Sequence, residues 1–150
     1  MLRNATIEDV KIIHRLLKHY ADEGLLLPRS ISSIYDKLRD FVVYVLEGEV
    51  VGVCALQIFW EDLAEIRSLA VTESAQGRGI GKQLVENCLQ GAKDLKITKV
   101  FTLTYQDEFF RKLGFYDIDK KELPHKIWSD CLHCPNFPEC DENALMFDNV

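Results

Sequence analysis

Hydrophobic positions follow strand-like and helix-like periods in an order that predicts a mixed fold. Apolar residues recur at helical spacing over residues 10–20, before Gly24, and again over residues 79–93. Short helices are expected after Ser30 and over residues 107–113. Strand-like runs are the segments 2–5, 41–46, 50–60, 63–71, 99–104, 115–120 and 144–148. Antiparallel hairpins followed by strand–helix–strand predict an α+β fold whose sheet contains at least one parallel crossover.

Composition limits the classes of partner that the chain is expected to have. Its 150 residues are the length of one ordinary domain, so we expect a single domain over 1–150. A formal net charge of -6 argues against non-specific binding to nucleic acid, which needs a basic surface. No apolar stretch approaches the length of a membrane span, and residues 1–4 contain no signal-peptide core. We therefore expect a cytoplasmic protein without nucleic-acid or membrane partners.

A glycine-rich segment, residues 76–81 (Gln-Gly-Arg-Gly-Ile-Gly), carries the clearest chemical signal. It lies between a predicted strand and the start of an amphipathic helix, where backbone N–H groups lack intrahelical partners. The helix dipole, the missing Cβ atoms and Arg78 would all favour a bound anion. An ordinary glycine-rich turn is the alternative. The spacing fits neither a P-loop nor a dinucleotide-binding fingerprint, so we favour a different pyrophosphate site.

Two segments together resemble the GCN5-related N-acetyltransferase (GNAT) family. Residues 66–81 are similar to the family's acetyl-CoA motif, and residues 109–115 (Phe-Phe-Arg-Lys-Leu-Gly-Phe) resemble its second signature. The resemblance implies a mixed six- or seven-stranded sheet flanked by helices, in which the fourth and fifth strands splay apart. Here those strands would be residues 63–71 and 99–104.

The same resemblance implies acetyl-CoA as co-substrate, bound in the gap between the splayed strands. Its pantetheine would pair with the strand that ends at Val71, and its pyrophosphate would lie on the glycine-rich segment. The residues expected to contact it are Leu69, Ala70, Val71, Gln76, Gly77, Arg78, Gly79, Ile80, Gly81, Lys82 and Phe110.

Catalysis would require a base for the acceptor amine, and a proton donor for the departing thiolate could assist. The resemblance suggests Glu65 as the base, acting through water, although a solvated acid at the strand edge is an equal alternative. Relatives often carry a tyrosine as the acid at the position of Phe110, and phenylalanine cannot donate a proton. Either the thiolate leaves unaided or Tyr105 supplies the proton.

The acceptor is suggested by a second resemblance, to the acetyltransferase domain of N-acetylglutamate synthase in a short, single-domain form. Segments 24–30, 41–46, 51–56, 65–71 and 123–128 carry it. It implies L-glutamate as acceptor, which is the first step of arginine biosynthesis. The two carboxylates of glutamate call for arginine forks, and Arg29 and Arg67 are the candidates, with surface roles as the alternative. Lys126 is a weaker candidate for a third charge.

A Cys- and Pro-containing insertion, about residues 124–142, leaves other functions open. Cys131, Cys134 and Cys140 have C-x2-C-x5-C spacing, which could hold a structural zinc with a histidine, but reduced cysteines in an ordered loop are favoured and no metal is expected. Acetylation of another small amine or of a protein amine is one alternative. A non-catalytic acyl-CoA-binding or metal-binding module is another. A homodimer is possible.

Overall fold

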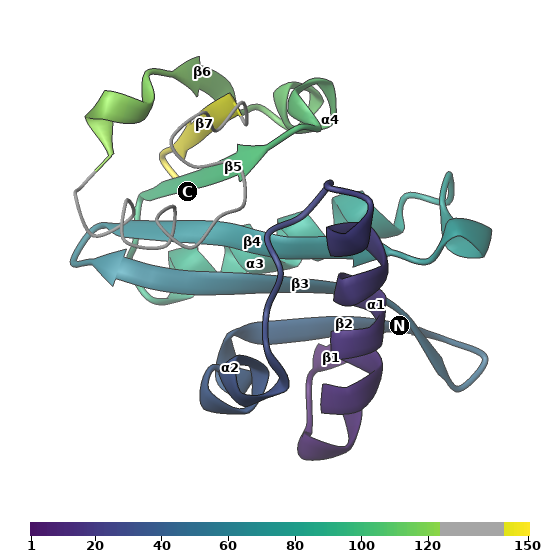
Figure 1. Cartoon of the computed structure of the whole chain (residues 1–150). Coiled ribbons are helices and arrows are strands. Elements are labelled where there is room, and N and C mark those ends of the chain that lie inside the picture. The colour runs from purple at the N-terminus through teal and green to yellow at the C-terminus, as the bar shows by residue number, and fades with distance from the viewer. Residues whose placement is uncertain (124–142) are drawn as a thin grey trace.

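The computed structural model describes residues 1–123 and 143–150, which build a seven-stranded sheet (Figure 1). The strand order is β1-β2-β3-β4-β5-β7-β6, and every neighbouring pair is antiparallel except β4–β5. This confirms the predicted mixed sheet. The strands are β1 (Leu2–Asn4), β2 (Phe41–Leu46), β3 (Glu49–Trp60), β4 (Leu63–Val71), β5 (Lys99–Thr104), β6 (Tyr116–Ile118) and β7 (Asn143–Asp148).

Local capping explains where the first two helices begin. The N-terminal helix follows a 3-10 turn at which the backbone N–H of Thr6 donates to Asp9 at 2.7 Å. Ser30 caps the next helix by accepting from the backbone N–H of Ser33 at 3.0 Å. The helices are α1 (Val10–Asp22), α2 (Ile31–Asp36), α3 (Ile80–Asp94) and α4 (Asp107–Lys112). None of the helices in the described part of the chain is long and apolar enough to cross a membrane.

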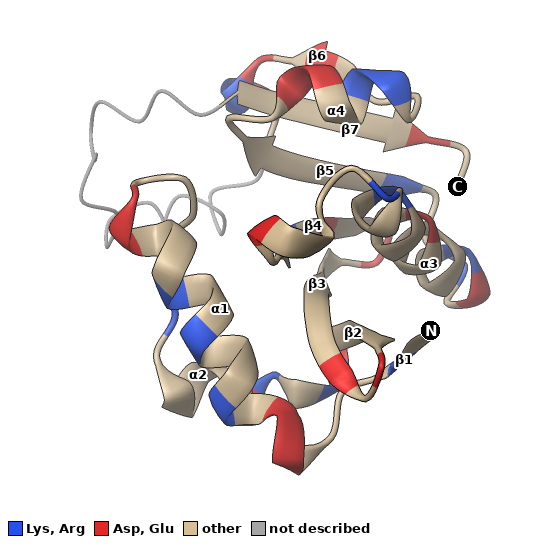
Figure 2. Ribbon diagram, turned by 90° about the vertical axis from the view of Figure 1, so that its right-hand side faces the viewer, with Lys and Arg blue, Asp and Glu red and all other residues tan. Residues whose placement is uncertain are grey.

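Helices cover both faces of the sheet (Figure 2). Helices α1 and α2 lie over one face, where Ile13 and Leu17 pack on Phe41. Helix α3 lies over the other face and shares its apolar core with Phe110 of α4. Each helix thus buries one apolar stripe, as the helical spacing predicts.

Strands β4 and β5 pair only where they begin. Their parallel register joins Ala64 to Val100 and Glu65 to Phe101. The Thr102 hydroxyl then donates to the carbonyl of Ile66 at 2.9 Å. Beyond this point the two strands diverge, and we call the position of Glu65 the fork. The divergence confirms the expected splay of the fourth and fifth strands.

A β-bulge interrupts β4 just beyond the fork. Val53 of β3 pairs with Ala70, and Ala55 pairs with Arg67. An advance of two residues along β3 therefore matches an advance of three residues along β4. Ser68 within the bulge has φ +57°, a left-handed conformation that is uncommon for a non-glycine residue. The extra residue reverses the faces of the following side chains. Leu69 accordingly packs on the α3 side, whereas Ala70 packs on the α1 side.

Candidate active site

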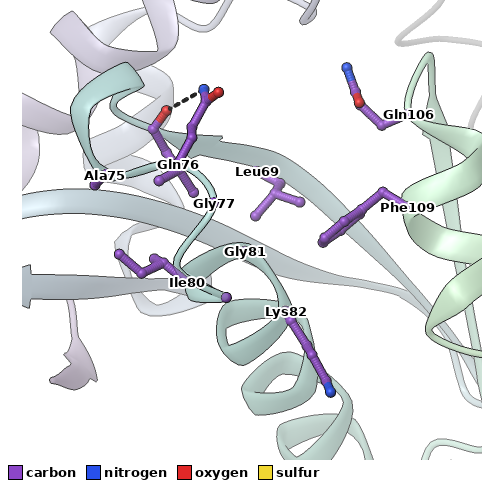
Figure 3. Close-up of a pocket in the computed structure, with 11 residues that line it drawn as sticks. Leu69, Ala75, Gln76, Gly77, Ile80, Gly81, Lys82, Gln106 and Phe109 are labelled. Atoms are coloured by element: carbon purple, nitrogen blue, oxygen red, sulfur yellow. Dashed lines mark hydrogen bonds between the residues drawn. The ribbon is translucent and has the colours of Figure 1, made fainter.

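A cavity of about 400 Å³ opens on the α3 side, beside the β4 segment beyond the fork (Figure 3). Strand β4, the loop after it, the first turn of α3 and the start of α4 all contribute to its walls. Its lining residues are Leu69, Val71, Ala75, Gln76, Gly77, Gly79, Ile80, Gly81, Lys82, Gln106 and Phe109. We call this cavity the donor pocket.

The glycine loop adopts a conformation that only glycine takes easily. Gly77 has φ +80° and Gly79, the residue before α3, has φ +77°. The first hydrogen bond of α3 runs from the N–H of Gln83 to the carbonyl of Gly79. The N–H groups of residues 80–82 therefore precede the helical ladder, and their dipoles add positive potential at the pocket. This end of the pocket suits a phosphate group.

A polar network anchors the loop to the end of β4. The Tyr20 hydroxyl of α1 donates to the carbonyl of Val71. The side-chain amide of Gln76 donates to that carbonyl at 3.2 Å (Figure 3). The same amide donates to the Tyr20 hydroxyl at 2.9 Å. Burial raises the pKa of Tyr20, so the hydroxyl stays protonated and able to donate at neutral pH.

A second cavity, of about 340 Å³, is lined by the α1–α2 loop, α2, β3 and β4. We call it the acceptor pocket. It brings together the two arginines predicted to bind substrate, Arg29 and Arg67, which come from the loop and from β4. Its other lining residues are Leu27, Pro28, Ser30, Ser33, Asp36, Lys37 and Gln57.

Neighbouring side chains hold both guanidinium groups in place. Arg29 donates from Nε and Nη2 to the Ser33 hydroxyl at 3.1 and 3.0 Å and lies over the Phe41 ring at 4.9 Å. Arg67 donates from Nη1 to Oε1 of Gln57 at 2.7 Å. The two cations are therefore oriented by the protein, as recognition of a planar carboxylate requires.

Charges around the acceptor pocket are coupled. Burial raises the pKa of the Asp40 carboxyl, while Lys37, Arg29 and Arg67 act in the opposite direction. Asp40 thus contributes negative charge within electrostatic reach of both arginines. It offsets part of their positive potential when it is ionised.

Glu65 lies at the fork, and it is buried, with 6% of its surface exposed. Its Oε1 is 3.7 Å from Nη1 of Arg67, so the carboxylate borders the acceptor-pocket wall. Tyr105 is half-buried directly after β5, on the opposite side of the gap, and precedes Gln106 of the donor pocket. One predicted catalytic residue therefore lies on β4 and the other directly follows β5, the two strands that diverge.

Eight of the eleven residues expected to contact acetyl-CoA line the donor pocket, and three do not. Ala70 packs on the opposite face because of the bulge, and Arg78 is exposed on the loop. Phe110 is buried in the core against Phe115, and its neighbour Phe109 lines the pocket instead. Sequence reasoning missed Phe109 because two adjacent phenylalanines in a six-residue helix leave the inward face ambiguous.

Several sequence candidates lie outside the described residues. These are Lys126 and the cluster Cys131, Cys134 and Cys140. Within the described ranges, one group has donor atoms near enough to hold a metal ion: His19, Glu23 and Glu73, all exposed and within 4.8 Å of one another. Exposed groups of this kind commonly occur without an ion.

Comparisons with known proteins decide the family. A sequence model described as the Acetyltransferase (GNAT) family matches residues 11–116. This chain belongs to the GNAT acetyltransferase family. An uncharacterized N-acetyltransferase of Chlorobaculum tepidum is 41% identical over 97% of this chain and 94% of its own length. An amino-acid acetyltransferase of Mycobacterium tuberculosis is 36% identical over 87% of this chain and 76% of its own.

Solved GNAT structures place the fold alongside enzymes that bind coenzyme A. Rv2747 from Mycobacterium tuberculosis, solved with CoA, superposes with a TM-score of 0.86 at 29% identity, covering 100% of this chain and 99% of the other. N-acetylglutamate synthase from Neisseria gonorrhoeae, solved with coenzyme A and N-acetyl-glutamate, gives 0.92 at 26% identity and covers 100% and 35%. The chain is accordingly an N-acetyltransferase that uses acetyl-CoA.

Proposed function

We propose that this chain acetylates the α-amine of an amino acid, with L-glutamate as the preferred acceptor. One observation carries the proposal: an oriented pair of arginines lines a pocket that borders Glu65 at the fork, while the donor pocket opens beside the same strand. A donor and an acceptor bound in these pockets would meet at the gap. The named relatives support the class of acceptor.

The donor pocket fits acetyl-CoA. The free N–H groups at the start of α3 suit its diphosphate, and the open space above Gly77 and Gly79 lets a bulky anion approach the backbone. Leu69, Val71 and Phe109 would flank the pantetheine arm. Bound acetyl-CoA supplies an acyl thioester, and the protein's task is to place it against the amine.

The acceptor pocket fits an amino acid with two carboxylates. Arg29 and Arg67 can each take one carboxylate, while Leu27 and Pro28 offer apolar surface to the carbon chain between them. A neutral amino acid such as glutamine would offer one guanidinium an amide in place of a carboxylate. A hydrogen bond to a neutral acceptor is weaker than one to an anion, so the pocket would discriminate against it.

Glu65 is proposed as the base and Tyr105 as the acid. The substrate ammonium must lose one proton before its nitrogen can attack, and the buried carboxylate at the fork can accept that proton through a water molecule. The new N–C bond forms as the C–S bond breaks, and the departing sulfur takes a proton from Tyr105. The second proton leaves the nitrogen to water, and water in turn reprotonates Tyr105. The whole catalytic unit would be a single domain of residues 1–150. Its product, N-acetylglutamate, would enter arginine biosynthesis.

A thiol-release assay with acetyl-CoA and a panel of amino acids and polyamines tests this function. We expect selective turnover with glutamate, and in Arg29→Ala a KM for glutamate raised about 100-fold, as loss of a charged contact predicts. Arg15→Ala, which removes an exposed arginine of α1, is the matched control and should match the wild type. Turnover with polyamines but not with amino acids would refute the proposal.

A further inference from the structure

Gln57 of β3 adjoins both Glu65 and Arg67 of β4. It is directly opposite Glu65 in the antiparallel register and one diagonal step from Arg67. Nη1 of Arg67 donates to its amide oxygen at 2.7 Å and lies 3.7 Å from Oε1 of Glu65. One guanidinium nitrogen therefore donates a hydrogen bond to a neutral amide while it lies at ion-pair distance from a carboxylate.

The relative distances of Gln57 and Glu65 from the guanidinium matter because Arg67 and Glu65 are shielded from water. The side chains of Arg67 and Glu65 are only 16% and 8% exposed. At low exposure an ion pair strengthens steeply as it shortens, and a tight pair lowers the pKa of the carboxyl. A tight pair would also weaken the attraction of the guanidinium for a substrate carboxylate. A neutral amide can hold the guanidinium without cancelling its charge.

We propose that Gln57 is a positioning residue: it holds the Arg67 guanidinium at the acceptor pocket and away from a closer ion pair with Glu65. The inference rests on the proposed function, in which Arg67 binds a carboxylate and Glu65 takes a proton. Gln57 thereby preserves both the charge that binds substrate and the proton affinity that a base needs.

Two substitutions of Gln57 separate positioning from simple packing. Gln57→Leu removes the neutral acceptor, so Arg67 closes on Glu65 and lowers the pKa of the base. Gln57→Glu gives Arg67 a charged partner and places a like charge beside Glu65, which raises that pKa. Each variant should raise the KM for glutamate by about tenfold, because each engages the guanidinium more tightly.

The pH profile gives the decisive readout. The base must be deprotonated, so the acidic limb of kcat/KM follows the pKa of Glu65. We expect this limb to move to lower pH by about 0.5–1 unit in Gln57→Leu and to higher pH by a similar amount in Gln57→Glu. Neither substitution changes the other charged or titratable groups of this region among the described residues. Those around the acceptor pocket are Arg29, Asp36, Lys37 and Asp40, and Tyr105 lies across the gap.

Gln90 provides matched controls. Its amide donates to Asp94 at 2.9 Å on the exposed side of α3, so Gln90→Leu and Gln90→Glu should leave KM and the pH profile unchanged. The affinity for acetyl-CoA and the unfolding temperature are measured in every variant. If Gln57→Leu does not fold, the unbranched Gln57→Met replaces it.

The outcomes distinguish this inference from the proposed function. Opposite shifts of the acidic limb support the positioning role. An active wild type whose limb is unmoved in both variants, or moves the same way in both, overturns the positioning role alone. A wild type that acetylates a different amino acid refutes glutamate as acceptor, and the profiles are then recorded with that amino acid. An inactive wild type overturns both proposals.

Discussion

Gly79 begins α3 in a left-handed backbone conformation, so its replacement by alanine tests the geometry of the donor loop. A Cβ added at Gly79 would meet nothing within 4 Å, so the substitution introduces backbone strain without a steric clash. A non-glycine residue in this conformation costs about 1–2 kcal/mol. For a chain of this length that corresponds to a fall in unfolding temperature of about 2–8 °C. The affinity for acetyl-CoA should also fall.

Gly81→Ala is the informative counterpart, two residues later. Gly81 lies inside α3, where alanine is favoured over glycine by about 0.5–1 kcal/mol. A Cβ there would lie 3.3 Å from Cζ of Phe109, so the ring must shift by a few tenths of an ångström within the donor pocket. The variant should therefore keep or gain stability while binding acetyl-CoA more weakly.

Calorimetric unfolding of the two variants, with and without acetyl-CoA, separates strain from binding. Without ligand, only Gly79→Ala should unfold at a lower temperature. With acetyl-CoA at a fixed excess, both should gain less stabilisation than the wild type, because that gain follows the ratio of ligand concentration to Kd. Wild-type stability in Gly79→Ala, or a greater loss in Gly81→Ala, would refute the reasoning from loop geometry.

Three further substitutions test the surroundings of the site. The carboxylate of Asp9 accepts from Nη1 and Nη2 of Arg3, at 2.7 and 2.9 Å, and this bonding holds the pKa of Asp9 below its usual range. Asp9→Ala should cost about 2 kcal/mol at pH 7, and urea unfolding should show the difference shrinking once the pH falls below about 3.9, the ordinary pKa of aspartate, and disappearing only below the lower pKa of the folded carboxyl; a constant difference would contradict this. Tyr20→Phe removes the hydroxyl that donates to Val71, so titration calorimetry should show about a fivefold weaker affinity for acetyl-CoA with an unchanged KM for glutamate; unchanged affinity would rule out the anchor. Phe110→Ala empties a core position that is 2% exposed, so thermal unfolding should show a loss of about 3–5 kcal/mol, and a loss below 1 kcal/mol would place the ring outside the core.

The periodicity of the chain predicted most of the fold. Strands β2, β4 and β5 begin and end at the predicted residues, because alternating β-branched and aromatic runs are bounded by turn residues. Cys54 and Cys88, which stand among apolar residues in the sequence, are likewise buried in the core. The glycine loop was recognisable because its chemistry is local to six consecutive residues. Features that depend on a single strand or on one helix turn could therefore be predicted from the sequence.

Features set by long-range register were not predicted. Gln57 gave no signal of its own, because its contact with Arg67 depends on how β3 pairs with β4. The bulge left a faint trace: apolar residues Ala64 and Ile66 are two apart, and Leu69 follows after three. This break in the two-residue alternation of apolar positions marks an inserted residue. Ala70 hides the break because it is also apolar and continues the even-numbered series of Ala64 and Ile66.

The bulge at Ser68 is what allows one strand to serve two pockets. In an uninterrupted strand all odd-numbered side chains share a face, so Glu65, Arg67 and Leu69 would point the same way. With the extra residue, Arg67 reaches the acceptor pocket while Leu69 lines the donor pocket. A left-handed serine costs of order 1 kcal/mol. That cost is compensated because β4 can then place the Glu65 carboxylate and the Arg67 cation on the side of the acceptor pocket and the apolar Leu69 in the wall of the donor pocket.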